Sequence, residues 1–116
     1  MESKETLREV LKVWGKEVWV VNCDKYCSKL LYLNKGACSS THMHPVKQET
    51  FYALEGQVAL TIEDKDYMLN PFSRPKTVYP RQKHLFWGIT DAKILEVSTH
   101  HSEEDVVRYT RSKSKQ

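Results

Sequence analysis

Residues 36–56 read GACSSTHMHPVKQETFYALEG and contain the most informative side chains of the chain. His42 and His44 are two positions apart, and side chains at that separation lie on the same face of a strand, so both imidazoles can reach one ion. Glu49 follows Pro45 and a short loop, which allow the next strand to begin with its side chains oriented independently of the strand before it. Imidazole and carboxylate ligands of this kind suit a divalent transition metal.

A second cluster completes the set of candidate metal ligands. His84 lies shortly after Pro80, at the start of another expected strand. Three imidazoles and one carboxylate would hold Mn, Zn, Fe, Ni or Co and leave open positions for water or a substrate. We therefore predict that His42, His44, Glu49 and His84 bind one divalent transition metal.

The chain around these residues is patterned as short strands. Residues 58–62 alternate apolar and polar side chains with a period of two, which is typical of a half-buried strand. Further strands are expected over residues 17–21, 29–34, 41–44, 49–54, 67–69, 77–79, 84–87 and 93–98. Glycine and proline separate them. This spacing predicts an all-β barrel or sandwich.

Helical structure is expected only near the two ends. Leu7, Val10, Leu11 and Trp14 are spaced as one apolar stripe of a helix over residues 4–14, which Ser3 would cap. The last three residues of this stretch could equally begin extended structure. Residues 103–109 are compatible with a helical turn. The first of these segments would dock on the β domain as a lid.

Composition and charge limit the class of protein. The chain has 116 residues, of which 40% are apolar and 28% charged, which predicts one globular domain over residues 1–116 with a core of about 12–108. The net charge of +3 comes from a basic tail at residues 109–116, so no nucleic-acid-binding face is expected. No apolar run is long enough to span a membrane, and no apolar signal region begins the chain, so we expect a cytoplasmic protein with reduced cysteines.

The two ligand clusters resemble the two motifs of the cupin superfamily. The pattern Gly36-x5-His42-x-His44-x4-Glu49-x6-Gly56 matches the first motif at every defined position. Residues 79–84 (YPRQKH) resemble the second, with a shorter gap between Pro80 and His84 and without the usual glycine. The resemblance implies a single jelly-roll barrel with the ligands at its mouth.

Other segments resemble one branch of the cupins. Residues 12–17 (KVWGKE) and 96–108 look like the segments that begin and end the domains of cupin sugar-phosphate isomerases such as mannose-6-phosphate isomerase. The loop HMHPVKQE resembles the metal loop of D-lyxose isomerases. This implies isomerisation of an aldose and a ketose through an enediol, with Lys47 stabilising the enediolate or a phosphate and Glu96 as candidate base.

Two alternatives remain open at this stage. The same donor set binds Fe(II) in cupin dioxygenases, and a cupin without catalysis could stack a sugar on Phe51, Tyr52, Phe86 and Trp87. By analogy with small cupins, a homodimer is expected. In each case the partner is a small molecule, a sugar or sugar phosphate for the isomerase.

Overall fold

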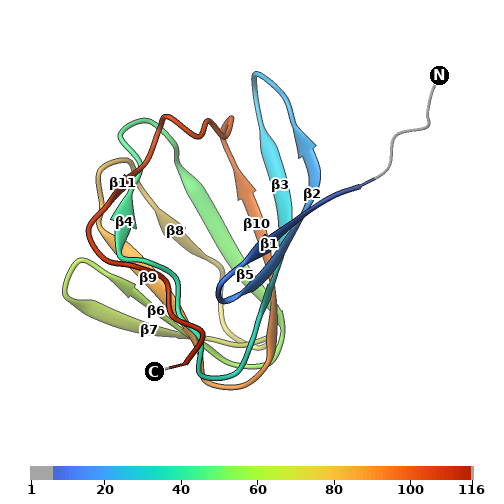
Figure 1. The fold of residues 1–116 in the computed structure, drawn as a ribbon, viewed down its shortest axis with the longest axis vertical. Helices are drawn as coiled ribbons and strands as arrows, with labels where there is room; N and C mark the ends of the chain where they lie inside the picture. The colour runs from blue at the N-terminus through green and yellow to red at the C-terminus, as the bar shows by residue number, and fades with distance from the viewer. Residues whose placement is uncertain (1–6, 116) are drawn as a thin grey trace.

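The computed structural model describes residues 7–115, which form eleven strands and no helix. They make two antiparallel sheets that fold over one another as a barrel (Figure 1). The first sheet has the order β1 (Arg8–Lys12), β2 (Gly15–Asn22), β3 (Cys27–Leu33), β10 (Ala92–Ser98), β5 (Glu49–Glu55) and β8 (Lys76–Val78). The second has the order β11 (Val107–Arg108), β4 (His42–Met43), β9 (His84–Gly88), β6 (Val58–Ile62) and β7 (Lys65–Leu69).

The predicted all-β architecture is confirmed. Each strand expected between residues 17 and 98 is present, with bounds within two residues of the expectation. The alternation that predicted them is also seen in their burial, since every second side chain of β3, β6 and β10, and of β5 as far as Ala53, is buried. Alternation of apolar and polar residues with a period of two is thus the signal that predicted these strands correctly.

The expected N-terminal helix is wrong for the residues that the structure describes. Residues 8–12 form strand β1, which pairs with β2 so that Lys12 lies opposite Gly15 and the chain reverses over two residues. Residues 4–6 of the expected helix lie outside the described residues. A backbone ladder with β2 therefore replaces the intrahelical hydrogen bonds that the periodicity suggested.

Burial explains why the apolar stripe was misleading. A docked helix would bury the whole stripe, but Leu7 is 60% and Leu11 80% exposed, while Trp14 is only 4% exposed. Trp14 packs edge-on against Phe86, with ring centroids 5.2 Å apart. Only Trp14 of the stripe is buried, and pairing of the backbone with β2 outweighs a weak local preference for helix.

The C-terminal residues also differ from the expectation. Instead of a helical turn over residues 103–109, a short turn leads into β11, which pairs with β4. The following basic residues run beside the stretch 38–41: Tyr109 N–H donates to Thr41 O at 2.8 Å, and Lys113 pairs with Cys38. The C-terminal segment is therefore held along the edge of the second sheet through backbone hydrogen bonds.

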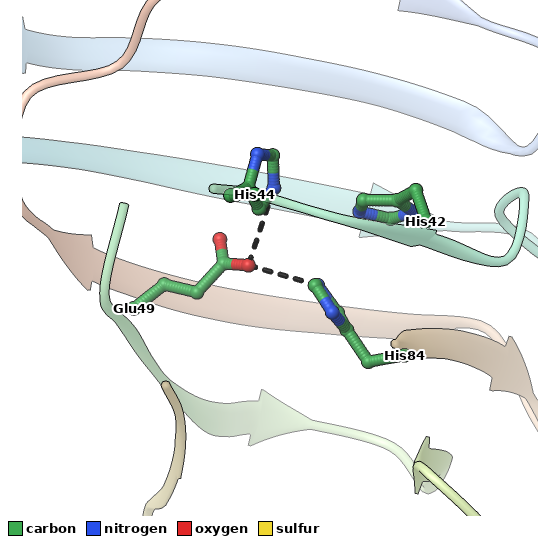
Figure 2. Close-up of side chains that lie close together, drawn as sticks. All are labelled: His42, His44, Glu49 and His84. Atoms are coloured by element: carbon green, nitrogen blue, oxygen red, sulfur yellow. Dashed lines mark ion pairs between the residues drawn. The ribbon is translucent and has the colours of Figure 1, made fainter. Parts of the chain in front are cut away.

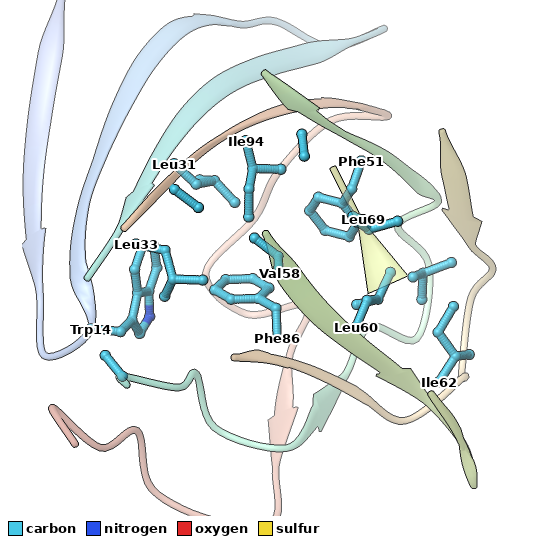
Figure 3. Packing of buried hydrophobic residues seen from close by; sticks show 14 residues of the cluster. Trp14, Leu31, Leu33, Phe51, Val58, Leu60, Ile62, Leu69, Phe86 and Ile94 are labelled. Atoms are coloured by element: carbon cyan, nitrogen blue, oxygen red, sulfur yellow. The ribbon is translucent and has the colours of Figure 1, made fainter. Parts of the chain in front are cut away.

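The apolar core fills one end of the barrel. Figure 3 shows Leu31, Leu33, Phe51 and Ile94 of the first sheet facing residues of the second across the interior. Along β3 the inward side chains change from leucine to Lys29 and Cys27, and along β10 from Ile94 to Glu96. The interior is consequently apolar at one end and charged at the other.

Tight turns close the strands. Gly36 and Gly56 both adopt φ of +81°, a left-handed conformation that glycine adopts without strain. Over residues 7–115 the structure contains no helix of the length and apolarity needed to cross a membrane.

Candidate metal centre and its cavity

The four side chains expected to hold a metal lie together at the charged end of the barrel. His42 of β4 is directly opposite His84 of β9, His44 follows β4, and Glu49 begins β5. Each offers one ligand atom, and these atoms all lie within 4.8 Å of one another (Figure 2). Both sheets therefore contribute to one group of donors that could hold a metal ion.

The backbone orients each imidazole. All three histidines donate Nδ1–H to a backbone carbonyl at 2.7 to 3.0 Å. The acceptors for His42, His44 and His84 are, respectively, the carbonyls of Ser40, Asp105 and Gln82. Such a bond fixes the tautomer and leaves the lone pair of Nε2 for an ion.

Two atoms of the cluster fit a cation particularly well. Glu49 Oε2 and His84 Nε2 are buried and lie 2.8 Å apart, yet neither has a partner in hydrogen-bonding geometry among the described residues. A cation beside both atoms would supply the partner that neither has within residues 7–115. The donor set and the two orphaned atoms thus fit a divalent transition metal.

The protonation states also suit a metal. Burial, with a smaller contribution from His84, lowers the pKa of His42 to about 3, and burial likewise lowers the pKa of His44. Burial alone would raise the pKa of Glu49, but His84 and the charge of Lys47 outweigh it and hold that pKa well below its usual range. At neutral pH His42 and His44 are therefore neutral and Glu49 is ionised, which are the ligand forms.

Lys47 and Glu96, the candidate catalytic residues, form a buried ion pair beside this cluster. Lys47 Nζ lies 2.8 Å from Glu96 Oε2 and 3.4 Å from Glu49 Oε1, and both partners of the pair are at most 4% exposed. Burial would lower the pKa of Lys47, but Glu96 and Glu49 together raise it above its ordinary value. Lys47 is thus held as an ammonium ion.

Sequence reasoning missed His101 and Asp105. His101 Nδ1 accepts a hydrogen bond from Lys47 Nζ at 3.0 Å, and its Nε2 donates to Glu103 Oε2 at 2.7 Å. Asp105 binds the metal loop: its carbonyl accepts from His44, and its carboxylate accepts the amides of Val46 and Lys47 at 2.9 and 3.0 Å. No local signal marks Asp105, because its contact with His44 spans 61 positions.

A second charged group on the cavity wall was also missed, although the sequence contains a signal for it. Lys29 is 1% exposed, and its Nζ lies 3.4 Å from Glu17 Oε1 and 4.1 Å from the ring centre of Trp19. Trp19 Nε1 donates to the same carboxylate oxygen at 2.9 Å. Lys29 occupies the inward register of β3 between Cys27 and Leu31, so alternation alone places it inside.

These groups surround a cavity of about 290 Å³. Its lining includes His42, His44 and Glu49, the pair of Lys47 with Glu96, the pair of Lys29 with Glu17, and residues of the C-terminal segment such as Arg108 and Ser112. The volume is at the small end of the range for ligand pockets, which suits a small polar molecule.

The aromatic residues considered for ring stacking are divided between two locations. Phe51 and Phe86 line the cavity and belong to the apolar core. Tyr52 is not part of the lining, and its hydroxyl donates to Pro71 O at 2.6 Å. Trp87 is 40% exposed on the opposite face of β9. The cavity wall is therefore richer in charged than in stacking side chains.

Comparisons with known proteins agree with this architecture. No family model matches the chain. The D-lyxose/D-mannose isomerase of Thermosediminibacter oceani is 29% identical in an alignment 112 residues long, with coverage of 73% of this chain and 61% of that enzyme. The chain thus spans less than two thirds of the length of this relative.

Several solved structures share the fold. Streptomyces Pac13, solved with uridine, has a TM-score of 0.79 and 14% identity, with 96% of this chain and 93% of that chain covered. KdgF from Halomonas sp. has a TM-score of 0.70 and 13% identity, with coverage of 77% and 81%. The capsular polysaccharide assembling protein CapF of Staphylococcus aureus has a TM-score of 0.77 and 12% identity, with coverage of 92% and 32%. These neighbours are cupin-fold proteins, and the chain shares their fold.

Proposed function

We propose that this cupin is a metal-dependent enzyme that interconverts the aldose and ketose forms of a sugar or sugar phosphate. The observation that carries the proposal is the buried pair of Lys47 and Glu96 beside the His/Glu cluster, inside one cavity. Isomerisation needs a group that moves a proton between adjacent carbons and a positive charge near the oxygen that becomes negative. The similarity to a D-lyxose/D-mannose isomerase supports the same reaction class.

In this proposal His42, His44, Glu49 and His84 hold a divalent transition metal, either Mn, Zn, Fe, Ni or Co. A bound metal of this kind polarises a carbonyl group and so acidifies the neighbouring C–H bond. The tautomers fixed by the backbone carbonyls keep the Nε2 atoms ready to bind it.

Glu96 and Lys47 have complementary roles in the proposed reaction. The carboxylate of Glu96 removes the proton from C2, the electron pair of that C–H bond forms the C1=C2 double bond, and the C1=O electron pair moves onto O1, which gives an enediolate. A proton then passes from O2 to O1, the C2=O double bond forms, and the C1=C2 electron pair takes the proton back from Glu96 at C1, which completes the ketose. Lys47, whose pKa is raised, remains an ammonium ion and stabilises the negative charge that develops on oxygen.

The test is proton exchange during turnover under anaerobic conditions. Protein loaded with Mn or Zn is incubated with D-mannose, D-lyxose and their phosphates in D2O, and NMR follows the ketose and the deuterium at its C1. We expect turnover without oxygen, and a loss of about 10²- to 10⁴-fold in Glu96→Gln with unchanged metal content. Glu104→Gln, which changes an exposed carboxylate outside the cavity, is the matched control. Turnover that requires iron and oxygen would replace this proposal with a dioxygenase, and binding without turnover would replace it with a sugar-binding cupin.

We also propose that two copies pair through strand β1 and that the protein acts in the cytoplasm. Strand β1 lies at the edge of the first sheet, and the adjoining Leu7 and Val13 are 60% and 59% exposed, with Leu11 of the strand 80% exposed. An apolar sheet edge of this kind favours pairing with another chain. Light scattering of wild type and Leu11→Lys tests the dimer, since the substitution should yield monomers.

A further inference from the structure

The C-terminal segment brings an arginine to the cavity beside the metal cluster. Strand β11 pairs with β4 so that Arg108 lies directly opposite His42. Side chains of directly opposite residues in an antiparallel pair project to the same side of the sheet. Both residues line the cavity, and Figure 1 shows β11 alongside β4. Arg108 is therefore part of the cavity rim at the end where the candidate ligands lie.

The position of Arg108 is fixed by its neighbours. On its C-terminal side, Tyr109 N–H donates to Thr41 O at 2.8 Å, and Thr41 N–H donates to Thr110 Oγ1 at 2.8 Å. Ser112, which also lines the cavity, accepts the amide of Ser40 on its Oγ at 3.0 Å, and this leaves its hydroxyl proton free to donate. The segment thus presents one guanidinium group and one hydroxyl donor from a backbone that is held in place.

Among the residues that the structure describes, Arg108 is the basic side chain of the cavity wall that has no acidic partner. Four basic side chains line it, and three of them have an acidic partner within 4 Å: Lys12 and Lys29 pair with Glu17, and Lys47 pairs with Glu49 and Glu96. Within residues 7–115, Arg108 forms no such pair and no side-chain hydrogen bond. Of the basic side chains that line the cavity in this part of the chain, Arg108 is therefore the one available to a ligand.

The total charge of the cavity also favours a negatively charged ligand. Its lining carries four basic side chains and four carboxylates, Glu17, Glu49, Glu96 and Glu103. These charges balance, so a bound divalent metal would leave an excess of two positive charges. A cavity with excess positive charge favours a ligand that carries negative charge.

We propose that the substrate of this cupin carries a carboxylate or phosphate group and that Arg108 binds this group at the cavity rim. The planar guanidinium matches either anion through two parallel hydrogen bonds, and the hydroxyl of Ser112 supplies a further donor. The proposal rests on the proposed function, because it places the remainder of the substrate at the metal cluster. It restricts the substrate to acidic sugars and sugar phosphates and disfavours neutral sugars.

The test compares matched ligands on the metal-loaded protein. Isothermal titration calorimetry with D-mannose, D-mannose 6-phosphate and D-mannuronate distinguishes the neutral sugar from its phosphate and its carboxylate. We expect at least one of the two anionic sugars to bind about 10- to 100-fold more tightly than D-mannose. Which one does so identifies the anion. Arg108→Gln should abolish this preference, whereas Arg111→Gln, which removes an exposed arginine of the same segment outside the cavity, should retain it.

The outcomes separate this inference from the proposed function. Equal binding of all three sugars, or a preference that survives Arg108→Gln, overturns the inference while the isomerase proposal stands. If no sugar binds but inorganic phosphate binds in wild type and Arg111→Gln and not in Arg108→Gln, the anion site stands and the sugar isomerase proposal fails. If neither sugars nor phosphate bind, both are overturned.

Discussion

Replacing Lys47 with methionine should strongly destabilise the metal-free protein. The ammonium group of Lys47 lies 2.8 Å from Glu96 and 3.4 Å from Glu49, and these carboxylates are 4% and 3% exposed. Methionine fills a similar volume but provides no charge. The substitution therefore leaves two buried carboxylates without their common partner.

The size of the effect follows from the cost of an unpaired buried charge. Removing one partner of a buried ion pair destabilises a protein by about 3–5 kcal/mol, which is a large part of the 5–15 kcal/mol typical of a domain. Adding Glu96→Gln to Lys47→Met removes one of the two unpaired carboxylates. The double variant should therefore recover about half of the loss, whereas additive behaviour would make it less stable than the single variant.

Urea unfolding in the presence of a chelator, followed by tryptophan fluorescence, measures these free energies. Lys25→Met, which removes an exposed lysine, is the control and should stay within about 0.5 kcal/mol of wild type. A value for Lys47→Met within 1 kcal/mol of this control would refute the account of a buried, charge-balanced network. The same conclusion would follow if the double variant were no more stable than Lys47→Met.

Three further predictions concern the metal loop, pH and the turns. Asp105→Ala should weaken metal binding about 10- to 100-fold in a competition titration, because it frees two amides of the loop; unchanged affinity would contradict this role. Between pH 6.5, the ordinary pKa of histidine, and about pH 3, His42 binds a proton in the unfolded chain but not in the folded protein. The free energy of unfolding of the metal-free protein should therefore fall on acidification by up to about 1.4 kcal/mol per pH unit. Urea unfolding at several pH values should show a smaller slope for His42→Gln. Gly56→Ala should lower Tm more than Gly36→Ala, although φ is +81° at both positions. The reason is that a Cβ would lie 2.2 Å from Asp91 O at position 56 but 3.9 Å from the nearest atom at position 36. Equal losses of Tm would show that backbone strain, and not the steric clash, determines the destabilisation.

The sequence predicted the barrel well because its strands are half-buried and alternate strictly. Residues 58–62 formed a strand with the expected bounds, and Phe51 and Ala53 face inward with Glu49 as their spacing indicates. The failure at residues 8–14 has a physical cause: a helical stripe and a hairpin both bury Trp14, and only pairing with β2, a tertiary contact, distinguishes them.

The site was predictable where its chemistry is local in sequence. His42, His44 and Glu49 lie close together in the sequence, so their spacing and the cupin motif brought them into consideration, and the resemblance to D-lyxose isomerases added Lys47. The network beyond them depends on distant segments. Asp105 and Arg108 reach the loop of residues 42–49 only because the C-terminal segment turns back to pair with β4. A two-residue strand is too short to show a periodic pattern in the sequence.

The most direct test of the account is the metal content of the purified, untagged protein beside that of His84→Ala. Elemental analysis should find about one divalent transition metal per wild-type chain, directly or after incubation with Mn, Fe, Co, Ni or Zn. The variant should contain none and retain the circular dichroism of a folded β protein. A wild-type chain that stays metal-free after incubation, or a variant with the same metal content, would contradict the central claim that these four side chains form a metal centre.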